Sequence, residues 1–127
     1  MLVSIDDIKK RGYDLKADGR LLQGDFATIE DSANQFITEC CDTVWGLIEK
    51  NRGFKWTQLF KKDVENETLK DELLDLFKER LKEAMIEQVV YIYENGDYNA
   101  SGIIDATRRA NSPKMLNKLY NIGIMRF

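Results

Sequence analysis

The chain has 127 residues, of which 43% are hydrophobic and 32% charged, and its formal net charge is −3. This length fits one domain that can bury a core without disulfides or bound metals, and the composition excludes a disordered chain. No apolar run is long enough to cross a bilayer, and the N-terminus lacks the apolar core of a signal peptide. We therefore expect a single domain over residues 1–127, made in the cytoplasm and not bound to a membrane.

Histidine is absent, which removes the usual general base of nucleophilic catalysis and the commonest nitrogen ligand for metals. The only cysteines, Cys40 and Cys41, are adjacent in a predicted helix, where neighbouring side chains point about 100° apart. We expect them to be small buried residues and not a disulfide or a redox pair. Only carboxylate or lysine chemistry is left for an enzyme, and such enzymes stay open at this point; the function favoured below is non-enzymatic and uses no cofactor.

The N-terminal part predicts a short helix followed by a loop. Ser4 with Asp7 three residues later is typical of a capping box, which opens a helix over residues 5–10. Residues 13–24 contain an Asp-Gly pair and further turn formers, which favour a loop. Two leucines of this loop are expected to contact the core, namely Leu21 and Leu22.

Two further helices are expected before residue 65. Asp25 is the predicted N-cap of a long helix over residues 26–51, whose apolar residues lie mainly on one stripe, and Gly53 supplies its stop. Residues 54–64 fit either a short helix or the start of a strand, and we favour the helix. Their mixture of aromatic residues and lysines is typical of core packing, although nucleic-acid binding proteins also use it.

Residues 71–95 carry the longest helical pattern, with no Gly or Pro inside it and Gly96 directly after it. Thr68 with Asp71 predicts a capping box at its start. From Ala84 onward apolar residues occupy both faces, which predicts burial on all sides. The expected structural core of this half comprises Ile86, Val89, Val90 and Tyr93. The cover is either the chain's own C-terminal element or a second copy.

The first half of this central helix is predicted to be amphipathic, with one apolar face and one acidic ridge. The apolar face includes Leu73, Leu74, Leu76 and Phe77, and the ridge comprises Asp71, Asp75, Glu79, Glu83 and Glu87. Three readings of the ridge stay open: a solvated face, a docking surface for a basic partner, or a magnesium site. All-helical nucleotide pyrophosphohydrolases hold magnesium with helical carboxylates, which is the enzymatic alternative.

Residues 98–127 are expected to form a C-terminal loop and docking arm. Five basic side chains and no acidic one follow Asp105, so the arm is basic and the rest of the chain is acidic. The loop contains a possible extended piece at residues 102–104. Ser112 and Pro113 then form a cap and first-turn pair for a short helix that ends at Gly123. The fold class expected is all-α: a small helical bundle around one long central helix.

The C-terminal third resembles a known family. The runs EQVVYIYENGDYN and SPKMLNKLYNIGIMRF are similar to the head-tail connector proteins (head completion or adaptor proteins) of tailed bacteriophages. The specific part of this resemblance covers residues 84–127. Within it, the loop 98–111 matches no pattern of the family. The positions that match as structural are Gln88, Tyr91, Gly96 and Asp97. Those that match in the terminal docking element are Ser112, Pro113, Leu116, Leu119, Gly123 and Arg126.

The resemblance implies a structural virion protein, assembled at the head-tail interface of a phage. Its partners would be other copies in a ring that matches the twelve-fold portal, the portal protein, the next connector or tail component, and DNA in transit through the channel. The residues expected to contact a neighbouring subunit or the portal are Arg108, Arg109, Met115, Leu119, Tyr120 and Arg126. The main alternative is a small cytoplasmic helical module that regulates or binds another protein.

Overall fold

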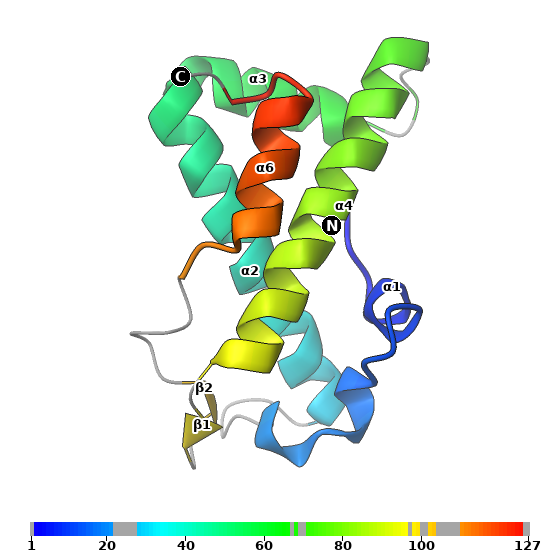
Figure 1. Cartoon of the computed structure of the whole chain (residues 1–127). Coiled ribbons are helices and arrows are strands. Elements are labelled where there is room, and N and C mark those ends of the chain that lie inside the picture. Colours follow the sequence, from blue (N-terminus) through cyan, green and yellow to red (C-terminus); the bar gives the residue numbers. More distant parts are fainter. Residues whose placement is uncertain are drawn as a thin grey trace.

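The computed structural model describes residues 2–21, 28–66, 68, 71–96, 98–99, 102–103 and 110–125. Two helices of 24 residues run through it, α2 (Ile29–Arg52) and α4 (Glu72–Asn95). Helix α6 (Pro113–Asn121) lies alongside α4, and α3 (Phe54–Glu65) crosses one end of the bundle (Figure 1). The remaining elements are α1 (Ile5–Lys9), the 3-10 turns η1 (Leu15–Ala17) and η2 (Gly19–Leu21), and a short antiparallel hairpin of β1 (Tyr98–Asn99) and β2 (Gly102–Ile103). The predicted all-α bundle around a long central helix is confirmed.

Several helix ends were predicted correctly from residues close to them in the sequence. At α1, the Ser4 hydroxyl accepts a hydrogen bond from the Asp7 N–H, and the Asp7 carboxylate accepts one from the Ser4 N–H, so the predicted capping box is present. Ser112 caps α6 with Pro113 in the first turn, and the left-handed Gly123 (φ 78°) follows the helix. The segment that begins at Phe54 is a helix, as favoured from the sequence.

Two predicted helix caps were wrong, although the central helix itself spans almost the predicted residues. Helix α2 begins at Ile29 and not at residue 26, because Thr28 adopts the extended cap conformation and its hydroxyl accepts a hydrogen bond from the Asp31 N–H at 3.1 Å. Asp25, the expected cap, lies outside the described residues. The predicted Thr68 box is also absent: Asp71 caps α4 directly, while the Thr68 hydroxyl donates to the side chain of Asn66.

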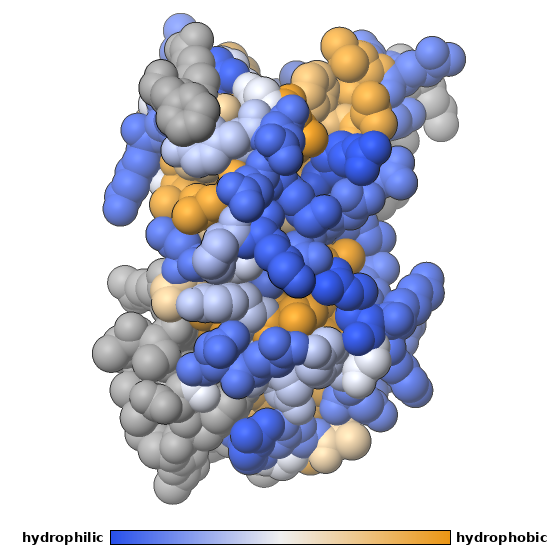
Figure 2. Space-filling view, viewed as in Figure 1, coloured by the Kyte–Doolittle hydropathy of each residue, from blue (hydrophilic) through white to orange (hydrophobic). Residues whose placement is uncertain are grey.

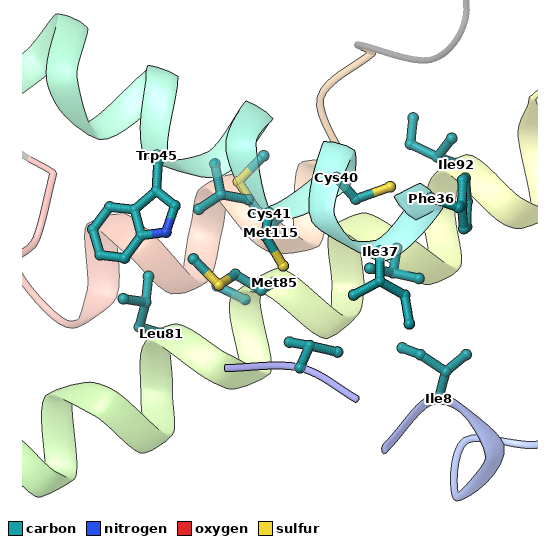
Figure 3. Packing of buried hydrophobic residues seen from close by; sticks show 14 of the residues in the cluster. Ile8, Phe36, Ile37, Cys40, Cys41, Trp45, Leu81, Met85, Ile92 and Met115 are labelled. Carbon is teal, nitrogen blue, oxygen red and sulfur yellow. The ribbon is translucent and has the colours of Figure 1, made fainter. Parts of the chain in front are cut away.

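The core lies between α2, α4 and α6, and α1 with the 3-10 turns closes it along one side (Figure 3). Within the second half of α4, Val89 and Val90 are buried, whereas Ile86 and Tyr93 are half-buried at the edge of the core. The prediction of burial on all sides therefore holds for only part of this half. The most extensive helix contact of α4 is with α6, so the chain's own C-terminal helix supplies the cover.

The predicted apolar face in the first half of α4 is only partly buried. Leu74 and Phe77 pack against the core, but Leu73 is 62% exposed and Leu76 is 49% exposed. The physical reason is that the first turns of α4 diverge from α6 and lie beside α3 instead (Figure 1). The helix forms here without a partner for these two leucines in the described part of the chain.

Candidate interaction surfaces

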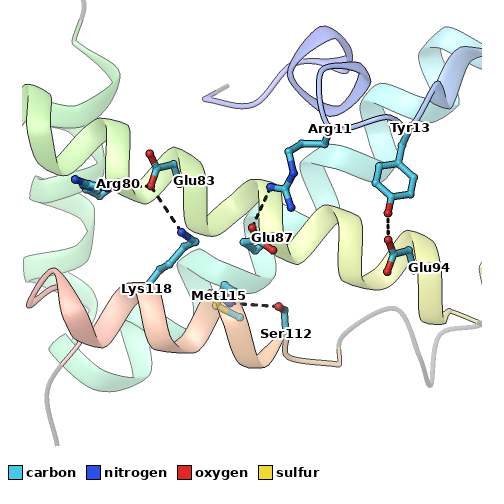
Figure 4. A network of polar contacts seen from close by, with 9 residues as sticks. All are labelled: Arg11, Tyr13, Arg80, Glu83, Glu87, Glu94, Ser112, Met115 and Lys118. Carbon is cyan, nitrogen blue, oxygen red and sulfur yellow. Dashed lines mark hydrogen bonds and ion pairs between the residues drawn. The ribbon is translucent and has the colours of Figure 1, made fainter.

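The C-terminal helix is fastened to the central helix by one buried amide. Gln88, which is fully buried, donates from Nε2 to the Ala110 carbonyl at 2.7 Å. Its Oε1 accepts a hydrogen bond from the Ser112 N–H at 2.9 Å. The Ser112 hydroxyl accepts the N–H of Met115 in turn, so Gln88 and the cap together fix the point where α6 begins (Figure 4).

The far end of α6 is held by an arginine from the end of α2. Arg52 donates from Nε to the Ile124 carbonyl at 2.8 Å and from Nη2 to the Gly123 carbonyl at 2.7 Å. Its guanidinium also lies 4.8 Å from the ring centre of Trp56, a cation–π arrangement. The sequence analysis did not predict these hydrogen bonds of Arg52.

The predicted contact residues of the C-terminal arm separate into two groups. Met115 and Leu119 have no exposed surface and pack in the core, and Tyr120 is half-buried against it. The expectation that Met115 and Leu119 contact a neighbour is corrected: in this fold their apolar side chains seal α6 against the chain's own core. The remaining predicted contacts, Arg108, Arg109 and Arg126, lie outside the described residues.

The acidic ridge of α4 is partly neutralised within the chain. Glu83 lies 3.4 Å from Arg80 and 3.8 Å from Lys118, and Glu87 lies 2.9 Å from Arg11 (Figure 4). Cations at these distances compete with a metal ion for the carboxylate oxygens. No cluster of three or more metal-ligating side chains occurs among the residues the structure describes.

The N-terminal turns are tied to the end of α4 by a polar network. The Tyr93 hydroxyl donates to Asp18 at 2.5 Å, and the Arg20 guanidinium donates to the same carboxylate at 2.6 Å. Hydrogen bonds from Arg20, with a further one from Tyr93, lower the pKa of Asp18 to about 2. Burial, reinforced by the adjacent carboxylate, raises the pKa of Tyr93. Tyr13 adds a hydrogen bond to Glu94.

No arrangement suited to catalysis stands out in the described residues. A hollow of about 440 Å³ beside α2 is lined by Glu39, Asp42 and Lys50 among others. It is open to solvent, whereas most ligand sites bury the larger part of their ligand. Both cysteines are buried, and neither is in a disulfide. Burial raises the pKa of Cys41 to about 12, which keeps this thiol protonated and unreactive.

Large apolar side chains are exposed along α3 and on the first turns of α4. Phe54 is 67% exposed and Leu59 57% on α3, and Leu73 and Leu76 are exposed on α4. Figure 2 shows hydrophobic surface gathered over the first turns of α4. An apolar group of this size, bordered by charged residues, is typical of a protein-interaction site.

Comparison with known family models, curated proteins and solved structures finds no match for this chain. A search of the described helices for one that is long and apolar enough to cross a bilayer finds none.

Proposed function

We propose that the chain is a structural subunit of the head-tail connector of a tailed bacteriophage. In this role, copies form a ring between portal and tail, extend the DNA channel and offer a docking platform to the next connector or tail component. The protein acts by binding and not by catalysis, and its place is the head-tail interface of the virion.

The observation that carries this proposal is the exposed apolar surface along α3 and on the first turns of α4. Leu59 and Leu73 keep more than half of their surface in water, at 57% and 62%. A subunit of an assembly has such surfaces because its neighbours cover them after assembly.

The resemblance in residues 84–127 gives independent support. Gln88 and Ser112, two positions that match the connector proteins, meet in a buried hydrogen bond in this fold. The matching residues therefore act as one unit, which holds the C-terminal helix against α4.

The burial of Met115 and Leu119 changes which residues of the arm can act as contacts. These two hold α6 in place, so the proposed contacts of the arm reduce to Tyr120 and three arginines, Arg108, Arg109 and Arg126. A triple substitution of the arginines by alanine tests these contacts while it keeps α6 in the chain, unlike a truncation that removes α6.

The test is co-assembly with purified portal protein of a tailed bacteriophage. We expect the purified chain to bind portal rings and to add a ring-shaped layer visible by electron microscopy, and the triple arginine variant to bind more weakly. A folded chain that does not bind the portal at micromolar concentration contradicts the proposal.

The second candidate is a small helical protein-binding module, which the same exposed apolar surface favours. Such a module stays a monomer or dimer whether or not portal is present. Light-scattering mass, measured on the chain alone and with portal, separates the two candidates, because only a connector gives a large complex with portal.

A further inference from the structure

One exposed face of α3 carries an apolar residue between two lysines. Lys55 precedes Leu59 by four residues and Lys62 follows it by three, so the three side chains lie on one face of the helix. All three are exposed, and Leu59 has 57% of its surface in water. We call these three residues the basic stripe.

One exposed face of α4 carries the same spacing with the opposite charge. Glu72 precedes Leu76 by four residues and Glu79 follows it by three. Both carboxylates are exposed, and Leu76 has 49% of its surface in water. We call these three residues the acidic stripe.

The charged groups of the two stripes do not pair with each other within one chain, because both stripes face solvent. No ion pair joins any of their four charged groups to another residue in the described ranges. Leu73, three residues before Leu76 and also exposed, enlarges the apolar area beside the acidic stripe.

The placement of Lys55 adds an electrostatic argument. It lies in the first turn of α3, where the helix dipole is positive, no acidic residue is present, and the cap residue Gly53 offers no side-chain hydrogen bond. Lysine is unfavourable at such a helix end. A carboxylate brought to it by another molecule would interact favourably with both the lysine and the helix terminus.

We propose that the basic stripe of one copy packs against the acidic stripe of a second copy. Leu59 then lies beside Leu76, and each lysine lies beside a glutamate. The contact uses two different surfaces, so each copy keeps one stripe free for a further neighbour, and repetition of the contact gives a ring when the rotation between copies closes. This inference deepens the proposed connector function by naming the surfaces that join the subunits.

Paired charge reversals test this contact. The variant K55E/K62E makes both stripes acidic, and E72K/E79K makes both basic, so each variant alone should lose self-association, with Kd raised about tenfold or more. An equimolar mixture should associate again, because every contact between unlike variants restores opposite charges. The control K9E/K10E changes the net charge as much as K55E/K62E does, but on α1, and should associate like the wild type.

Sedimentation velocity at low ionic strength, up to millimolar protein, provides the measurement. Circular dichroism shows that each variant is folded, as expected for exposed positions. Reversed variants that associate like the wild type overturn the proposal, as does a wild type that stays monomeric throughout this range.

Cross-linking provides a second test that detects weak contacts. A mixture of Leu59→Cys and Leu76→Cys chains, treated with a short bismaleimide, should give a covalent dimer, whereas either variant alone should not. The buried native cysteines keep the background low. A mixture that gives no more dimer than the single variants overturns the proposal.

These tests need no phage component, so they separate this inference from the proposed function. If the reversed variants bind the portal as the wild type does and still associate normally, the stripe contact is contradicted and the connector function stands. If association depends on the stripes but no portal binding is found, the connector function is contradicted and the stripe contact stands.

Discussion

The hydrogen bonds of Gln88 are expected to decide whether the C-terminal helix stays docked. The substitution Gln88→Met keeps a side chain of similar volume, so it creates little cavity. It removes the acceptor of the Ser112 N–H, a group whose residue is only 2% exposed. Leaving a buried donor unpaired costs about 1–3 kcal/mol. The Ala110 carbonyl belongs to an exposed residue and can accept a hydrogen bond from water instead, so the loss of its hydrogen bond to Gln88 adds little to the free-energy cost.

We therefore expect Gln88→Met to lower the free energy of unfolding by about 1–3 kcal/mol. Urea denaturation gives this value, and hydrogen exchange should show faster exchange in residues 113–121 than in α2. The matched control is Gln35→Met, at a half-buried helix position whose amide bonds only Glu39, and it should change stability by less than about 0.5 kcal/mol. Equal effects of the two substitutions, or uniform exchange, refute the reasoning.

Three further predictions concern other parts of the fold. Arg52→Lys breaks the paired hydrogen bonds to the segment at Ile124 and should destabilise the protein by about 1 kcal/mol in urea, while leaving α2 helical. The Asp18 carboxylate, whose pKa falls from 3.8 to about 2 on folding, stabilises the protein above about pH 4 and loses this effect as the pH drops toward 2. Asp18→Asn should thus cost about 1 kcal/mol at pH 7 and almost nothing at pH 2, in urea titrations at both pH values. Leu81→Ala, in the core, should cost about 2–5 kcal/mol of stability in urea, whereas Leu76→Ala, on the exposed side of α4, should cost less than about 0.5 kcal/mol. Similar losses would contradict the burial of Leu81 and the exposure of Leu76.

The sequence predicted those features that depend on a few neighbouring residues. The capping box at Ser4, the Ser112 cap, and the helical state of residues 54–64 are all set by interactions within one or two turns. The failure at Thr68 also has a local cause. Asn66 Oδ1 accepts the Thr68 N–H that the box would give to Asp71, and Asp71 is itself a good cap.

The contacts that hold the C-terminal segment could not be predicted from spacing. Gln88 reaches a partner 24 residues away and Arg52 partners 71 and 72 residues away, so only the folded arrangement brings them together. A weak signal existed at Gln88, a neutral amide inside an apolar run. A polar side chain in such a place needs a buried partner.

The exposure of Leu73 and Leu76 explains why periodicity alone misjudged the first half of α4. An apolar stripe on a helix shows that the helix has something to bury, but not whether the same chain supplies the cover. For the second half of α4, α6 is that cover, and Gln88 and Arg52 hold it in place. The first turns diverge from α6, and Leu73 and Leu76 stay in water there beside Glu72 and Glu79. A helix that has a cover from its own chain along one part, and exposed leucines along another, is what a subunit needs when the second partner is another molecule.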